Sequence, residues 1–359
     1  MRTSLRLIAS VLPIVLLVVG AYRDCSGCMD FQLKAKDGTT VEGRTLEFPS
    51  NLDSKLLINP RGISFQSPTP SGGDGLKWTN KFGYYGMNAF GMPIMFDGMN
   101  EKGLSLGALW LPGYTEYETP GPGEQSCALA NTVLGDWILG NFSNVDEVRA
   151  ALKNLKVWGQ KMPQFGNQPA PIHLAVNDAS GKSIVIEFVG GSKQIYDNPV
   201  HVLTNAPPFP WHLINLRNYV QLSPLDPGAK TADGQTYQSP GAGGGLLGLP
   251  GDWSPPSRFI RVCALVLFSL QPKDAKSAVS LTSHIINAED IPIGVIRESS
   301  PKGTEYGYTQ WSVIKDQRNK VIYFRGYEDL GFKAYPMSDY DLKEGAKQRT
   351  VVVRGTSGD

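Results

Sequence analysis

Segments with the pattern of β-strands and segments with the pattern of α-helices come in separate blocks along this chain of 359 residues. The chain also holds 40 glycines and 26 prolines, which imply many turns. Turns at this density favour a strand-rich protein over a helical bundle. No internal repeat and no obvious linker divides the sequence. Strand blocks that alternate with helix blocks are expected where helices cover β-sheets.

The blocks give a set of expected elements. Paired strands are predicted over 31–35 with 39–46, within 84–111, over 172–176 with 183–188, and over 309–314 with 320–325. Helices are predicted over 128–139, 143–155 with Ser143 as cap, 254–270 with Ser254 as cap, and 276–288. Long surface loops are predicted over 49–80, and a cleft-covering segment over 222–257.

Charge and composition argue against several functions. The 34 basic and 33 acidic residues balance, so nothing suggests a nucleic acid or a membrane surface as partner. The four histidines have no metal-ligand spacing, and residues 241–251 lack the Gly-Lys-Ser/Thr of a phosphate loop. We therefore expect no cofactor and no metal.

The N-terminus has the layout of a secretory signal. Arg2 and Arg6 precede an apolar run that ends in the small residues Val19-Gly20-Ala21. The predicted organisation is a signal peptide at 1–21, a short propeptide at 22–27 and a single domain at 28–359. The mature protein is then expected in the periplasm or outside the cell, and no further segment approaches the length of a membrane span.

Removal of 27 residues would make Cys28 the first residue of the chain. Its thiol, with a pKa of about 8.5, would then lie beside a free α-amine of about 7.7–8.0, so proton transfer between them is nearly balanced. A thiolate that attacks an amide carbonyl forms an acyl-enzyme, and the protonated amine can supply the proton of the leaving group. This chemistry needs no histidine.

Arg44 and Glu47 follow Cys28 at short intervals across a predicted hairpin. A two-residue turn at Asp37-Gly38 would set Cys28 opposite Glu47. A three-residue turn with Gly38 in the left-handed region would set Arg44 opposite Asp30, on the same side as Cys28. We favour the second register, since it brings a guanidinium to the thiol, although Asp30 could then pair with Arg44.

Other interpretations of Cys28 stay open at this point. It could be a structural cysteine, half of a redox or metal pair with Cys25, or a lipidation site. The metal pair lacks a second pair of ligands, and the redox pair lacks a strand-then-helix context. After maturation Cys28, Cys127 and Cys263 remain, so at least one thiol stays unpaired.

Several segments together resemble the choloylglycine hydrolase family of N-terminal-nucleophile enzymes. The segments are Cys28, Lys36-Asp-Gly38, Gly43-Arg-Thr-Leu-Glu-Phe48, Asp97-Gly-Met-Asn-Glu-Lys-Gly-Leu104, Leu203-Thr-Asn-Ala-Pro207, Trp211–Arg217 and Gly248–Phe259. They span most of the mature chain in consistent order, so the match is specific as a set.

The resemblance implies a role for six residues. They are Cys28 as nucleophile, Arg44 as a contact of its sulfur, Glu47 as the acid that holds the α-amine, Asn205 as oxyanion donor, Trp110 as the backbone N–H that completes the oxyanion hole, and Arg258 as the second arginine of the site. The sequence departs from the family pattern at Glu47, where Asp is frequent, and at Met29-Asp30, where small or hydroxyl residues are usual.

The resemblance also implies an α+β fold, with two stacked antiparallel sheets between helical layers in the order αββα. The expected activity is hydrolysis of a small-molecule linear amide, with penicillin V or an N-acyl homoserine lactone preferred because an aromatic at Trp110 could narrow the pocket against a rigid steroid. A conjugated bile acid hydrolase is the second expectation. Rivals are a non-catalytic exported binding protein and a lipid-anchored protein. Members are often homotetramers.

Overall fold

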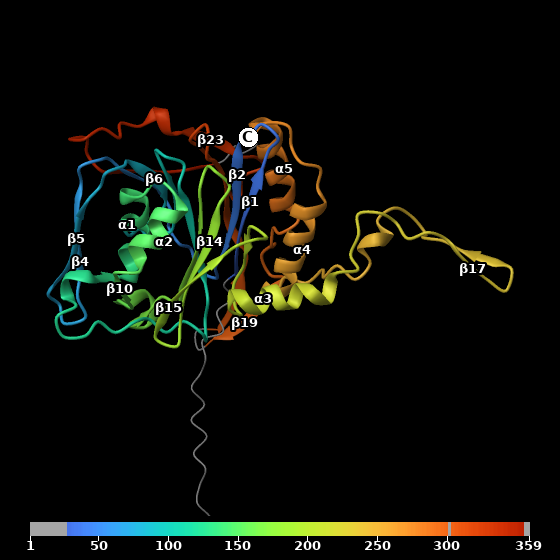
Figure 1. Ribbon diagram of the computed structural model, residues 1–359, viewed down its shortest axis with the longest axis horizontal. Helices are drawn as coiled ribbons and strands as arrows, with labels where there is room; N and C mark the ends of the chain where they lie inside the picture. The colour runs from blue at the N-terminus through green and yellow to red at the C-terminus, as the bar shows by residue number, and fades with distance from the viewer. Residues whose placement is uncertain (1–26, 301–302, 355–359) are drawn as a thin grey trace, which may run out of the picture.

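Two antiparallel sheets stacked face to face form the body of the protein (Figure 1). The computed structural model describes residues 27–300 and 303–354. The predicted signal peptide and the propeptide up to residue 26 lie outside these residues.

The first sheet has six strands and the second has eight. The spatial order of the first is β16 (Val202–Leu203), β1 (Gly27–Lys34), β2 (Thr40–Glu47), β21 (Thr309–Asp316), β22 (Val321–Gly326) and β23 (Lys333–Pro336). The order of the second is β15 (Ser192–Asp197), β14 (Ser183–Val189), β13 (Ile172–Asn177), β8 (Ser105–Trp110), β7 (Asp97–Asn100), β6 (Tyr84–Met87), β3 (Leu56–Asn59) and β24 (Arg349–Val351).

Helices cover the outer face of each sheet (Figure 1). Helices α4 (Pro255–Phe268) and α5 (Ala275–Asn287) pack on the first sheet, and α1 (Leu134–Asn141) packs on the second, beside α2 (Val145–Leu152). The short α3 (Phe209–Asn215) lies near α4. The expected four-layer αββα architecture is therefore confirmed.

Smaller elements decorate this frame. The strands are β4 (Ser64–Pro68), β5 (Asp74–Thr79), β9 (Ala128–Ala130), β10 (Lys156–Trp158), β11 (Lys161–Met162), β12 (Gln168–Pro169), β17 (Lys230–Ala232), β18 (Gln235–Tyr237), β19 (Ile296–Ser300) and β20 (Gly303–Gly307). The 3₁₀ turns are Gln125–Cys127, Asn131–Val133, Pro163–Phe165, Leu216–Tyr219, Gly244–Leu246 and Met337–Asp339.

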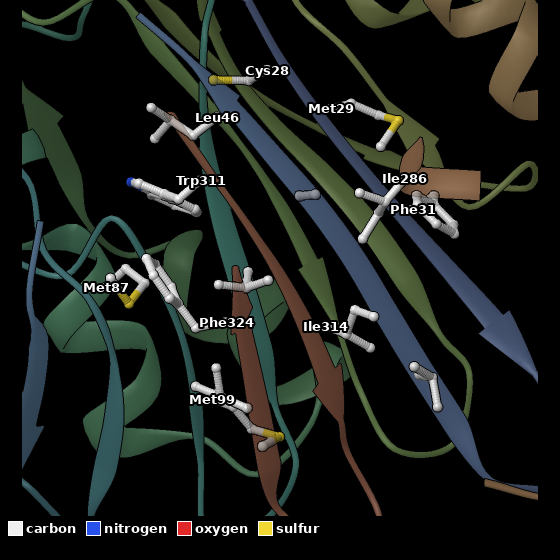
Figure 2. Packing of buried hydrophobic residues seen from close by; sticks show 14 of the residues in the cluster. Cys28, Met29, Phe31, Leu46, Met87, Met99, Ile286, Trp311, Ile314 and Phe324 are labelled. Carbon is white, nitrogen blue, oxygen red and sulfur yellow. The ribbon is translucent and has the colours of Figure 1, made fainter. Parts of the chain in front are cut away.

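Side chains alternate across the first sheet in the way its strands require. Cys28, Leu46 and Trp311 project from one face, toward the second sheet (Figure 2). Met29 and Phe31 project from the other face, toward the α5 layer. All five are buried, so both faces of β1 are covered: the outer face is apolar, and the face between the sheets carries Cys28 together with the buried polar residues Asp30 and Gln32.

The structure corrects three of the expected elements. Residues 49–80 are not only loops, because they contain β3 and the β4–β5 hairpin. The helix expected from residue 128 begins at Leu134, since 128–130 pairs with β10 as a strand. The cap of α2 is Asn144 rather than Ser143: its side chain accepts from the Glu147 N–H, whereas Ser143 bonds the Glu147 carboxylate.

The Gly/Pro-rich segment at 222–257 was expected to cover a cleft, and that expectation is wrong for most of it. Much of the segment extends away from the body as an arm that carries β17 and β18 (Figure 1). Both strands of this hairpin are exposed along their whole length. A composition rich in glycine and proline predicts an irregular segment, but it does not predict the direction in which that segment leaves the body of the protein.

None of the helices in the described part of the chain is long and apolar enough to cross a membrane.

Asp136 of α1 is a buried carboxylic acid with a predictable effect on stability. Burial raises its pKa from 3.8 to about 6, against the hydrogen bonds that it accepts from Tyr84 and the Met95 N–H. The folded state therefore binds this proton more tightly than the unfolded state does, and the free energy of unfolding falls as pH rises from about 4 to 6, by about 3 kcal/mol from this group. Denaturant unfolding across this range is expected to show that fall in the wild type and to lack this contribution in Asp136→Asn.

Candidate active site

Cys28 is the second residue of β1 and is buried between the sheets. The register of its hairpin is the one that we favoured: Cys28 pairs with Leu46, Asp30 pairs with Arg44, and Gly38 has a φ of +85° in the turn. Gly27, the residue on the N-terminal side of the predicted cleavage point, pairs with Glu47. The hairpin thus holds the Gly27–Cys28 peptide beside two of the predicted site residues.

Arg44 reaches the sulfur of Cys28. Its Nη2 lies 3.9 Å from the Cys28 Sγ and donates a 2.5 Å hydrogen bond to the carbonyl of Ala108. Its Nε lies 3.4 Å from Asp97 Oδ2, in an ion pair in which both side chains are fully buried. Asp30 lies opposite Arg44 in the strand pair, as expected, but the ion pair that the structure gives Arg44 is with Asp97.

Two opposing effects act on the Cys28 thiol. Burial is the larger and raises the pKa of the thiol, whereas Arg44, next in size, lowers it. Glu47 adds a rise and Arg258 a further fall, and the net shift is upward. These are the conditions of a peptide-linked Cys28, whose nitrogen carries no charge. A protonated α-amine on the same residue would add a cation and favour the thiolate.

Asn205 joins Cys28 to Trp110. Its Oδ1 accepts a 2.5 Å hydrogen bond from the Cys28 N–H, and its Nδ2 donates a 2.8 Å bond to the Trp110 carbonyl. An amide nitrogen carries two protons, so Nδ2 retains one with which to bind an oxyanion. The predicted neighbourhood of Cys28, Trp110 and Asn205 is present, and the assignment of oxyanion roles stays a prediction.

Glu47 and Arg258 form a buried ion pair of 2.8 Å. The other oxygen of Glu47 accepts from Thr309, and Arg258 also contacts Glu289 at 3.2 Å. Burial opposes the charge on Arg258, but Glu47 and Glu289 outweigh it and raise the pKa of the guanidinium. The predicted contact between Glu47 and an α-amine stays a prediction, because Gly27 continues the chain here and Cys28 donates to Asn205.

The residues that support Asn205 were not predicted from the sequence. His173 bonds the carbonyl of Thr204 through Nε2 and Glu187 through Nδ1, and His212 bonds the carbonyl of Asn205 itself at 2.9 Å. Burial lowers the pKa of His212 to about 4, so it is neutral at pH 7. These histidines lie 39 positions apart, with no spacing pattern, and only the fold brings them to one loop.

Aromatic rings line the cavity at the Cys28 thiol, and Phe165 packs against two of them. Trp110 packs against Phe48 and Phe165, and Phe90 packs against the same two rings, with ring centroids 5.0–5.9 Å apart. The cavity that Cys28 shares with Phe48, Phe90 and Trp110 has a volume of about 20 Å³. That is room for one water molecule, so an acyl group can enter only if rings move.

Comparison with known proteins identifies the family. Residues 28–352 match the linear amide C–N hydrolases, choloylglycine hydrolase family. The chain belongs to this family. It is 34% identical over 322 residues to a bile salt hydrolase/transferase of Clostridium perfringens, which covers 88% of this chain and 94% of the relative. It is 27% identical over 307 residues to a penicillin V acylase of Pectobacterium atrosepticum, covering 79% and 73%.

The fold of this choloylglycine hydrolase family member agrees with a solved relative. The structure of a variant of the conjugated bile acid hydrolase from Clostridium perfringens matches with a TM-score of 0.79 and 30% identity, over 92% of this chain and 99% of that one. The family and the αββα fold that the sequence resemblance implied are therefore confirmed, and the chain is an amide hydrolase of the N-terminal-nucleophile type.

Proposed function

We propose that the protein is an exported amidase that cleaves linear amides with Cys28 as N-terminal nucleophile, and that its preferred substrates are of the penicillin V or N-acyl homoserine lactone kind. The observation that carries the chemistry is the convergence of Arg44 and Asn205 on the two ends of one residue: the guanidinium on the sulfur, the amide on the nitrogen. The family match that begins at residue 28 supports the same starting point.

In the proposed mechanism each group has a step. After removal of residues 1–27 the α-amine of Cys28 takes the thiol proton, and the thiolate, facing Arg44, attacks the amide carbonyl. The free proton of Asn205 Nδ2, with the backbone N–H of Trp110, would stabilise the oxyanion. The ammonium then gives its proton to the leaving amine, and water, deprotonated by the same amine, releases the acid from the acyl-enzyme.

The aromatic walls favour the first substrate class. Phe48, Phe90 and Trp110 line a narrow cavity at the sulfur, and such aromatic walls suit an aryl or alkyl acyl group better than a rigid fused-ring steroid. Bile acid amides are the second candidate, since the bile salt hydrolase relative, at 34% identity, is more similar than the penicillin V acylase at 27%.

Release of the free amine separates these candidates. The purified protein is incubated with penicillin V, an N-acyl homoserine lactone, and glycine- and taurine-conjugated bile acids, and kcat/KM is measured for each. We expect the first two to exceed the bile acid conjugates. Exclusive cleavage of the conjugates would reverse the order, and no cleavage by correctly matured protein would favour the exported binding protein.

Gly27 gives a test of maturation. A Cβ built on Gly27 would lie 2.8 Å from Arg258 Nη1 and 3.2 Å from Glu47 Oε2, and Arg258 is fixed by its ion pairs. We expect Gly27→Val to displace the Gly27–Cys28 peptide and leave most of the protein uncut and inactive. N-terminal sequencing measures the fraction that begins at Cys28.

The matched control is Gly228→Ala, which has open space around the new Cβ and is expected to mature as the wild type does. Full processing of Gly27→Val would contradict the proposed cleavage point. A wild-type chain that starts at Tyr22 would contradict maturation altogether, and mass spectrometry of the same sample detects a lipid on Cys25 or Cys28.

Export to the periplasm or medium and assembly into a homotetramer belong to the same proposal. Cell fractionation tests the first, and the mass of the purified protein in solution tests the second.

A further inference from the structure

Arg44, which contacts the Cys28 sulfur, belongs to a group of five buried ionisable side chains. Each is at most 1% exposed. They come from four strands: Asp30 of β1, Glu42 and Arg44 of β2, Asp97 of β7 and Lys315 of β21. The two sheets meet here, so the group bridges both. We call it the buried charge cluster.

Lys315 fixes the side of the cluster that holds Arg44. Its Nζ lies 2.6 Å from Asp97 Oδ2 and 2.5 Å from Glu42 Oε1, and it donates a 3.1 Å bond to the carbonyl of Leu106. Three partners match the three protons of an ammonium. The same Oδ2 of Asp97 lies 3.4 Å from Arg44 Nε. A continuous path of contacts thus runs from Lys315 through Asp97 and Arg44 to the sulfur.

The charges in the cluster do not balance without a proton. Two cations face three carboxylates, whose nearest oxygens lie within 4.8 Å of one another. Asp30 forms no ion pair within the described residues: its Oδ1 accepts from Asn177 at 3.1 Å, and its buried Oδ2 has no hydrogen-bond partner as a carboxylate. An unpaired charge at such depth is costly, and carboxylates that share a site retain a proton.

We propose that the buried charge cluster is a positioning unit for the nucleophile, in which Lys315 and Asp97 hold Arg44 against Cys28 and a proton shared by Asp30 and Glu42 keeps the net charge at zero. This inference rests on the proposed role of Cys28.

The titration directions agree with this arrangement. Burial raises the pKa of Asp30 well above its usual value, and the neighbouring Glu42 raises it further. The pKa of Glu42 is lowered, because Lys315 and hydrogen bonds from its neighbours outweigh the burial that opposes its charge. The proton is therefore carried by Asp30 and donated to Glu42.

Loss of that proton has a consequence for the thiol. Asp30 is paired with Arg44 across the strands, so its ionisation would place an uncompensated negative charge beside the guanidinium. The groups that face Asp30 are Glu42, Arg44, Asp97, Lys315, the amide of Asn177 and, one pleat along its own strand, Cys28. A new anion there disfavours the thiolate, so reactivity is expected to fall when pH rises past this ionisation.

Asp30→Asn tests the proton. Asparagine has the size and neutrality of a protonated aspartic acid, so the variant is expected to keep kcat/KM and the rate of Cys28 alkylation by iodoacetamide within about twofold at pH 7. Its alkaline limb of kcat/KM is expected at higher pH than that of the wild type. Alkylation is followed on the Cys28 peptide by mass spectrometry. A tenfold loss at pH 7 would show that the Asp30 charge is required and would overturn the proposal.

Lys315→Met tests the positioning path. It leaves Glu42 without its cation and Asp97 with Arg44 alone, so Arg44 is no longer held from behind. We expect alkylation of Cys28 to slow about tenfold or more and kcat to fall with KM little changed. Unchanged alkylation and kcat would overturn the path. If Lys315→Met does not fold, the alkylation rate and kcat/KM of Asp30→Asn still test the proposal. The control is Asp136→Asn, a buried carboxyl that bonds Tyr84 and the Met95 N–H and is not part of the buried charge cluster, and it is expected to leave alkylation unchanged.

Alkylation needs no substrate, and this separates the two proposals. A wild type whose Cys28 alkylates as expected but that cleaves no amide contradicts the proposed function alone. An active amidase in which Asp30→Asn loses reactivity contradicts the positioning unit alone.

Discussion

Cys28→Ala is expected to lower kcat for every amide substrate by about 10³-fold or more, because no other group in the site can form the acyl-enzyme. The other groups of the site act as hydrogen-bond donors, cations or acceptors: Asn205, Arg44 and the Glu47–Arg258 pair. Among the residues that the structure describes, no histidine contacts Cys28. The loss is measured as initial rates of amine release on protein whose N-terminus has been sequenced.

The same variant separates catalysis from folding. The side chain of Cys28 is small and 6% exposed, and alanine leaves its strand partner Leu46 in place, so the far-UV spectrum and unfolding midpoint are expected to stay near those of the wild type. If the variant is made in the full-length chain it is also expected to retain residues 22–27, which makes the uncut N-terminus a second readout.

Cys263→Ala is the matched control. Cys263 lies in α4, is 8% exposed, and burial alone raises the pKa of its thiol far above the ordinary value. Its sulfur is therefore unreactive, and its removal is expected to leave kcat unchanged. Amidase activity that survives in Cys28→Ala, with protein that is folded, would contradict the cysteine mechanism.

The sequence was sufficient to place the first part of the site because that part is local. Asp37-Gly38 with a left-handed glycine sets the register of one hairpin, and that register alone puts Arg44 opposite Asp30 and on the face of Cys28. Chain distances of fewer than 20 residues leave few arrangements. Asn205 and Arg258 came instead from the resemblance, since nothing in their own surroundings distinguishes them from a turn residue and a helix residue.

The rest of the site depends on contacts between distant strands. Asp97 and Lys315 are 218 positions apart and meet only because β7 and β21 belong to facing sheets. Lys315 directly follows the strand predicted over 309–314, where a lysine is expected to face solvent, yet it belongs to β21 and its side chain is fully buried. Lys315 can be buried because its ion-pair partners carry the opposite charge. Which residues those partners are cannot be deduced from the sequence before the fold is known.

Glu289 illustrates the same limit at the second arginine. It follows α5 in an unremarkable Asn-Ala-Glu-Asp stretch, but it receives Arg261 at 2.6 Å and Arg258 at 3.2 Å. Burial raises the pKa of this carboxyl, against the two arginines that lower it. The network explains why Arg258 can sit fully buried in the first turn of a helix, where a cation opposes the helix dipole.

Asn205→Asp is expected to lower kcat by about 10²–10³-fold, with little change in KM, because it exchanges the only side-chain donor of the predicted oxyanion hole for a carboxylate. The acceptor side is retained: an aspartate oxygen can still receive the Cys28 nitrogen, which in the mature chain is an amine. The donor side is lost, since the carboxylate cannot bond the Trp110 carbonyl and would repel a developing negative charge.

Asn198→Asp provides the comparison. Asn198 is also buried, and its Oδ1 accepts from the Val202 N–H, an acceptor role that aspartate preserves. It lies seven positions before Asn205 and contacts neither Cys28 nor Trp110, so kcat is expected to stay near the wild-type value. Steady-state kinetics on both variants separate an oxyanion donor from a merely structural amide. The donor produces a loss in kcat alone at position 205, whereas an amide that only supports the loop would lower the unfolding midpoint and leave the kcat of the folded fraction intact.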